Sequence, residues 1–169
     1  MCDRRAWTQR FLAVLNDVLG WTATESEDGD IFFGNDGSGF GIVNYAPEDP
    51  EYLVVQTGVP LETYENGSAA FPDRATTLSL VARAANRVNV MQKGVKITVD
   101  EDHLVFAVEM VAAAPHCLPA PAHLAAVLPR ARGMLVAAVV RFREEIALVG
   151  IAAVSADASA DADERSELS

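Results

Sequence analysis

The chain has 169 residues, of which 50% are hydrophobic, and a net charge of −11 at pH 7. A chain of this length can bury enough apolar surface to fold as one domain without a disulfide or a structural metal. The negative charge argues against nucleic-acid binding, because acidic surfaces repel phosphate backbones, and the apolar runs at 133–140 and 146–154 are shorter than the roughly 20 residues that span a bilayer.

The first residues, MCDRRAWTQR, have neither the apolar segment nor the cleavage site of a signal peptide. We therefore expect a cytoplasmic protein in which Cys2 and Cys117 are free thiols. The span between Arg10 and Arg74 holds twelve acids and no Lys or Arg. Such a span favours either simple solubility or the binding of a basic partner.

An amphipathic helix is predicted at residues 4–19, with Asp3 as its N-cap and Gly20 just past its end. Trp21 is then expected to pack back on Leu15. The apolar residues recur at spacings of three and four, as in a helix with one buried face. They are Trp7, Phe11, Val14, Leu15 and Val18.

Three short strands are predicted next, at 31–33, 40–45 and 52–59. The segment GNDGSG between the first two is rich in residues that tolerate positive φ, which is typical of a hairpin turn. The segment APEDP separates the second strand from the third.

A second helix is predicted at 74–91, with Asp73 as its N-cap. Its apolar face is built largely from small side chains, which let another element approach closely. The residues of this face are Leu78, Val81, Ala82, Ala85, Val88 and Asn89. We expect Leu78, Val81, Ala82 and Ala85 to take part in self-association.

The remainder predicts a β-hairpin at 95–110, a Pro-rich link at 112–121 and a final helix from Pro121. Pro129 is expected to kink or restart that helix. We expect one folded domain over 1–154. The acidic, low-complexity segment 155–169 is predicted to be a disordered tail.

The predicted order is α-β-β-β-α-β-β-α. Strands in runs, separated by single helices, indicate an α+β domain with a single antiparallel sheet packed by helices.

The first strands are apolar on both faces. Val43 and Tyr45 alternate with Ile42, and Leu53 and Val55 alternate with Val54. Because monomers rarely expose large contiguous apolar patches, the second face needs a cover. Three covers are open: the domain's own helices, a second copy of the chain, or a client protein.

The second half of the chain resembles the YbjN family of bacterial proteins. The similar features are the helix ending in RAANRVNVM, the hairpin VKITVDEDHLVFAVEM, the Pro-containing link and the long last helix. That family is similar in fold to the type III secretion chaperones, including the Tir chaperone family. The resemblance implies a non-enzymatic, usually dimeric domain that binds other proteins, and it brings no catalytic residue with it.

No motif indicates catalysis, a metal or a cofactor. His116, Cys117 and His123 lie close in sequence, but structural zinc needs about four ligands and no second cluster accompanies them. Cys117 has no orienting acid nearby in sequence, as a thiol nucleophile needs. The glycine-rich turn lacks the phosphate-loop pattern, and the aspartates at 28–36 and 100–102 lack the spacing of a calcium loop.

We therefore expect a cytoplasmic, non-enzymatic, chaperone-like or adaptor domain that acts as a homodimer on a protein client. The alternative is an acidic inhibitor or immunity protein for a basic toxin or enzyme. Neither a membrane nor a nucleic acid is expected as a partner. The residues predicted to contact a partner are Val43, Tyr45, Leu53, Val55, Leu78, Val81, Ala82 and Ala85.

Overall fold

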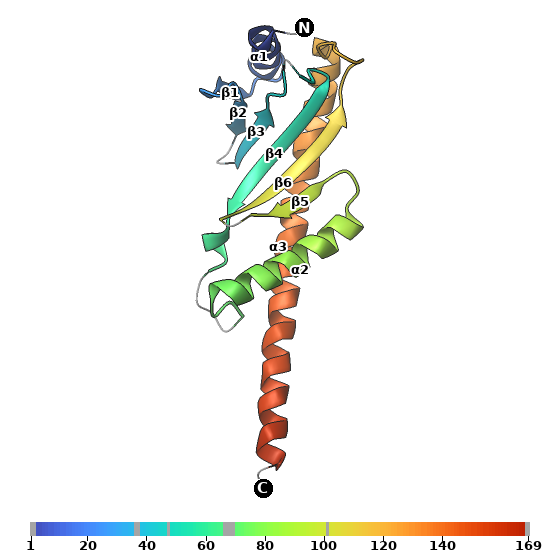
Figure 1. Ribbon diagram of the computed structural model, residues 1–169. Helices are drawn as coiled ribbons and strands as arrows, with labels where there is room; N and C mark the ends of the chain where they lie inside the picture. Colours follow the sequence, from blue (N-terminus) through green and yellow to red (C-terminus); the bar gives the residue numbers. More distant parts are fainter. Residues whose placement is uncertain (1–2, 36–37, 47, 66–69, 101, 168–169) are drawn as a thin grey trace.

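The computed structural model describes residues 3–35, 38–46, 48–65, 70–100 and 102–167 (Figure 1). The helices are α1 (Arg4–Ala13), α2 (Arg74–Met91) and α3 (Pro121–Glu167), with a π-helical segment at Val14–Val18 and a 3₁₀ turn at Leu61–Thr63. The strands are β1 (Thr22–Glu25), β2 (Ile31–Asn35), β3 (Ser38–Val43), β4 (Tyr52–Pro60), β5 (Lys96–Val99) and β6 (His103–Val111).

The strands form one antiparallel sheet of six strands in the order β1-β2-β3-β4-β6-β5. This confirms the α+β fold with a single antiparallel sheet packed by helices. The sequence did not predict β1, because Thr22–Glu25 contains one apolar residue, Ala23, and so has no visible alternation. Since β1 pairs with β2, it forms one edge of the sheet, and β5 forms the other.

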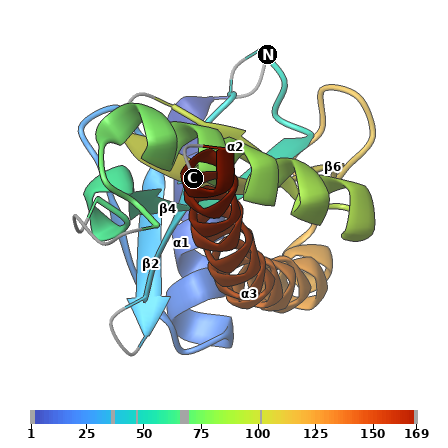
Figure 2. The same ribbon diagram turned by 90° about the horizontal axis from the view of Figure 1, so that it is seen from below.

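The core lies between one face of the sheet and the helices. α1 packs on β1 and β2, α3 packs on β4 and β6, and α2 packs on β5 and crosses α3 (Figure 2). Alternate strand residues fill this core because side chains alternate between the two faces of a strand. The fully buried side chains on the sheet include Ile31, Ile42, Leu53, Val55, Leu104 and Phe106.

The end of the first helical segment differs from its prediction. Asp3 caps α1, and its carboxylate accepts a hydrogen bond from Arg5 N at 3.2 Å. The helix then widens to a π-helix, in which Leu19 N donates to Val14 O at 2.9 Å. Each wider turn holds an extra residue, so Val18 rotates out of the predicted apolar face and is exposed.

The residues after this helix confirm Gly20 as the position just past its end. Gly20 has φ +67°, which suits glycine at the end of a helix. Trp21 bonds to Leu15 through the backbone, N to O at 2.8 Å. Its ring stacks on Phe33, with 5.3 Å between the ring centroids, and so fixes the helix end on β2.

α3 is continuous over 47 residues, so the helix does not restart at Pro129. Pro129 is exposed, while Leu128, Ala131 and Leu135 on the opposite side are fully buried. Continuous packing of that face keeps the chain helical across the proline. The backbone also continues as helix through Glu167, where the sequence predicts a disordered tail from residue 155.

None of the helices in the described part of the chain combines the length and apolar character that crossing a membrane requires.

Candidate interaction surface

One face of the sheet carries no helix. α3 passes behind β4 and β6, and no helix lies in front of these two strands (Figure 1). We call this surface the open sheet face. It consists of the strand residues that alternate with the core positions. They are Thr22, Thr24, Phe32, Gly34, Gly39, Gly41, Val43, Tyr52, Val54, Gln56, Gly58, Lys96, Thr98, Val105, Ala107, Glu109 and Val111. Of these, Val54 is buried among its neighbours.

An aromatic pair stands at one end of the open sheet face. The rings of Tyr45 and Tyr52 meet edge to face, with 5.6 Å between their centroids. Tyr52 Oη donates to Glu109 Oε2 at 2.9 Å, and this bond is the main reason that the pKa of Tyr52 is raised above its usual value. Tyr45 is 39% exposed and Val111, opposite Tyr52 on β6, is 69% exposed. The pair therefore presents a rigid apolar surface with a fixed polar rim.

The middle of the open sheet face is a glycine-lined hollow. Phe32 is 55% exposed, and its ring lies 3.6 Å from where a Cβ on Gly41 would be. A Cβ on Gly39 would meet no atom within 4 Å. The hollow has a volume of about 280 Å³ and extends from Phe32 to Val105 on β6. The Phe32 ring covers Gly41, which is buried, whereas Gly39 and Gly58 are exposed, so another chain can approach the sheet backbone closely at those two glycines.

Both edges of the sheet are closed by asparagine side chains. Asn16 Oδ1 accepts from Ala23 N at 3.0 Å, and its Nδ2 donates to Ala23 O at 3.3 Å. Asn89 binds Ile97 in the same way, at 2.8 and 2.9 Å. Each amide occupies the outward N–H and C=O of one residue in a four-residue edge strand, which leaves an added strand fewer groups to pair with. A ligand of this sheet is therefore expected on its face and not along these edges.

Four of the eight residues predicted to contact a partner belong to the chain's own core, which corrects the prediction for them. Leu53 and Val55 are fully buried beneath α3, and Val81 and Ala85 are buried on the inner side of α2. Helical and strand periodicity showed that these residues share apolar faces, but not that α3 covers those faces.

The other four predicted residues are accessible to different degrees. Val43, Leu78 and Ala82 are half-buried, and Tyr45 is exposed. Val43 and Tyr45 lie on the side of the open sheet face, whereas Leu78 and Ala82 lie on α2, so the structure does not bring the eight together. The prediction omitted Phe32 and Val111, the most exposed apolar residues of the open sheet face. Their alternation with buried neighbours was the signal that could have identified them.

The acidic span does not form a single free patch. Asp30 Oδ1 accepts from Asn44 N at 2.8 Å, and Glu51 Oε2 accepts from His116 N at 3.0 Å. Asp73 caps α2 by accepting from Thr76 N at 2.8 Å. Several of these carboxylates therefore hold loops and helix ends of their own chain.

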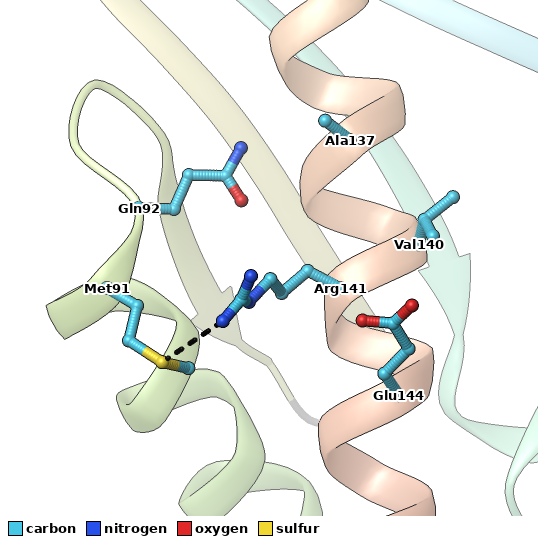
Figure 3. Close-up of a pocket in the computed structure, with 6 residues that line it drawn as sticks. All are labelled: Met91, Gln92, Ala137, Val140, Arg141 and Glu144. Carbon is cyan, nitrogen blue, oxygen red and sulfur yellow. Dashed lines mark hydrogen bonds between the residues drawn. The ribbon is translucent and has the colours of Figure 1, made fainter.

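A larger hollow, of about 470 Å³, lies between the end of α2 and α3 (Figure 3). Arg141 reaches across it, with its guanidinium 3.5 Å from the Met91 sulfur. Gln92, Ala137, Val140 and Glu144 complete the lining. These six residues include no Ser, Cys or His that could act as a nucleophile or base with Glu144, so the hollow presents no acid–base or nucleophilic pair.

Among the residues that the structure describes, no group of three or more His, Cys, Asp or Glu side chains gathers as a metal site would require. Cys117 is a free, exposed thiol beside His116, which has φ +59°. Cys2, Asp36 and Glu101 lie outside the described residues. The Pro-rich link thus has the character of an exposed turn.

Comparison with known proteins finds no matching family model, no matching curated protein and no matching solved structure. The resemblance to the YbjN family and the secretion chaperones stays a prediction from element order. Any functional proposal therefore depends on the surfaces of this chain.

Proposed function

We propose that the chain is a non-enzymatic protein-binding domain of the cytoplasm, chaperone-like or adaptor in action, which works as a homodimer and holds a client segment on the open sheet face. The observation that carries this proposal is the one-sided cover of the sheet. Every helix packs on one face, while the other exposes Phe32, Tyr45 and Val111.

The chemistry of the open sheet face suits an extended apolar segment. Phe32, Tyr45 and Val111 offer apolar area at separate points, and the exposed glycines of the hollow, Gly39 and Gly58, let the client backbone come close. Because the asparagine amides occupy both edges, we expect the client to lie across the strands. The face carries few charged groups, so binding should depend mainly on burial of apolar surface.

The test uses reduced insulin, whose B chain aggregates, as a model client. We expect the wild-type protein to delay the rise in light scattering, and the double variant Phe32→Ser/Val111→Asp to lose most of that protection. The matched control is Val90→Asp, since Val90 is an exposed valine on α2, away from the sheet. Circular dichroism checks that all three proteins keep the same fold.

Three outcomes decide the proposal. Protection that survives in the double variant excludes the open sheet face, and no protection by the folded wild type excludes chaperone action on this client. Raising the salt to about 0.5 M should change protection little, because salt at that concentration screens interactions between charges and not the burial of apolar surface. Loss of binding at that salt would favour the alternative of an acidic inhibitor.

A further inference from the structure

α3 has a second apolar stripe outside its buried face, and Val136 and Val140 at its start border a hollow against Phe40 and Val59 of the sheet. Val136, Val140, Ile151 and Val154 are 39–66% exposed, and Ala147 is exposed between them. Spacings of three, four and seven residues place these positions on one face of a helix. Around the helix axis they lie about a third to a half of a turn from the buried stripe that includes Leu135, Phe142 and Val149.

Nothing in the described part of the chain covers the far end of this stripe. α3 is about 70 Å long at 1.5 Å per residue, and it projects well beyond the sheet and α2 (Figure 1). The last residue buried by the rest of the domain is Gly150, which packs near Phe71. An unsupported helical segment of this length is marginal in water, so its stability calls for a partner along the stripe.

The charge along α3 indicates what that partner is. Residues 130–143 carry Arg130, Arg132, Arg141 and Arg143, whereas residues 156–167 carry five acids and one arginine. Acids near a helix C-terminus are unfavourable to the helix dipole. A second α3 running in the opposite direction would place the basic half of each copy beside the acidic end of the other. Charge complementarity therefore favours a second copy of this chain.

We propose that two copies pair antiparallel through this stripe and cross near Ala147. Val140 of one copy then meets Val154 of the other, and Arg130 lies beside the acidic segment after residue 156. Arg132 already has partners in its own chain, because its guanidinium lies 5.5 Å from the ring centroids of Trp21 and Phe40. The small side chain of Ala147 at the crossing lets two helices reach the usual 8–10 Å between axes. This inference rests on the proposed function in one respect: it names the interface of the homodimer proposed there. Pairing through α3 leaves the open sheet face of each copy free.

The first test is the mass in solution, by light scattering after size exclusion. We expect the wild type to be a dimer and Val140→Asp/Val154→Asp to run at half that mass, with at least a tenfold weaker association. The matched control, Ala137→Asp/Ser155→Asp, adds the same charges one residue off the stripe and should stay dimeric. A wild-type monomer, or equal masses for the two variants, would overturn the proposal.

The second test is the direction of pairing, in a chain with Cys2→Ser and Cys117→Ser. Ala147→Cys should form a disulfide dimer under mild oxidation, because residue 147 of one copy faces residue 147 of the other at the crossing. Ala126→Cys, also exposed on α3, should not, since the two thiols would lie about 60 Å apart. Cross-linking at both positions would indicate parallel pairing and contradict the model of crossing helices.

The two proposals can fail separately. Phe32→Ser/Val111→Asp should lose protection of insulin and keep the dimer mass. The α3 double variant should lose the dimer mass, and each protomer should still carry an intact open sheet face. If removal of residues 156–169 leaves the dissociation constant unchanged at low salt, the acidic segment is not a partner of the arginines and the antiparallel register is wrong.

Discussion

At the scale of single residues, one buried carboxylate depends on one exposed arginine. Glu145 of α3 is only 7% exposed, and Arg87 Nε of α2 lies 3.1 Å from its Oε2. The contact is close, but Oε2 makes no well-aligned hydrogen bond among the described residues. The pair joins α2 and α3 where the two helices cross. Removal of Arg87 would leave the Glu145 carboxylate buried without a counter-charge, which is costly.

We expect Arg87→Ala to destabilise the fold by about 1–3 kcal/mol, because the buried carboxylate then loses its counter-charge. The midpoint of urea unfolding measures this change. Adding Glu145→Gln to the variant should restore part of the loss. Arg83→Ala, at an exposed position of the same helix, serves as the control. An equal loss in both single variants would show that the ion pair is not the cause.

A second residue-scale prediction concerns the start of α2. The Thr76 backbone N–H, bonded to the Asp73 carboxylate, lowers the pKa of Asp73 below its usual 3.8. A lowered pKa in the folded state gives stability that is complete above pH 3.8 and is lost as the pH falls through the lowered value. The Tm difference between wild type and Asp73→Ala should therefore shrink below pH 3.8. A difference that stays constant down to pH 2 would contradict this role of the cap.

At the scale of elements, the edges of the sheet show how a side chain can replace a strand. Asn16 and Asn89 come from the two helical segments that flank the sheet, and each satisfies the N–H and C=O of one edge residue. Free edges pair readily with other chains. The asparagines thus restrict association to surfaces other than the strand edges.

We expect Asn89→Ala to destabilise the protein by about 1–2 kcal/mol, because the polar backbone groups of Ile97 lose their partners. The variant should also form larger species at high concentration, through the exposed edge of β5. Urea unfolding and sedimentation velocity measure the two effects. Asn86→Ala, on the exposed side of α2, is the control. Unchanged stability in Asn89→Ala would show that water replaces the amide without loss.

The elements differ in how far the sequence predicts them. Asp3 and Asp73 mark helix starts by their chemistry, and both caps are confirmed. β1 was missed because its pairing with β2, and not its own pattern, makes it a strand. The restart at Pro129 was wrong because long-range packing of α3 outweighs a local preference.

The surfaces were predicted less completely than the elements. The two-faced character of the early strands was evident from alternation, and the open sheet face agrees with it at Val43 and Tyr45. Alternation did not indicate which face of the sheet the helices would cover. Leu53 and Val55 were therefore assigned to a partner, although α3 buries them. Each asparagine contact at an edge joins a helical residue to a strand residue seven or eight positions later, and no turn or capping motif in the sequence indicates it.

At the scale of the whole molecule, α3 separates two surfaces. The sheet lies against one side of this helix (Figure 1), and the exposed stripe from Val136 to Val154 lies outside that contact, with only its first half bordering the sheet. A ligand that fills one surface therefore has no steric reason to displace a ligand from the other.

This separation has a consequence for avidity. A pair of protomers joined through α3 offers two equivalent sites on a rigid frame, and each can be occupied while the frame stays closed. A client with two apolar segments and a linker long enough to span the frame would bind the second site at a high effective concentration. Its residence time would then exceed that of either segment alone, whereas a client with one segment would exchange freely.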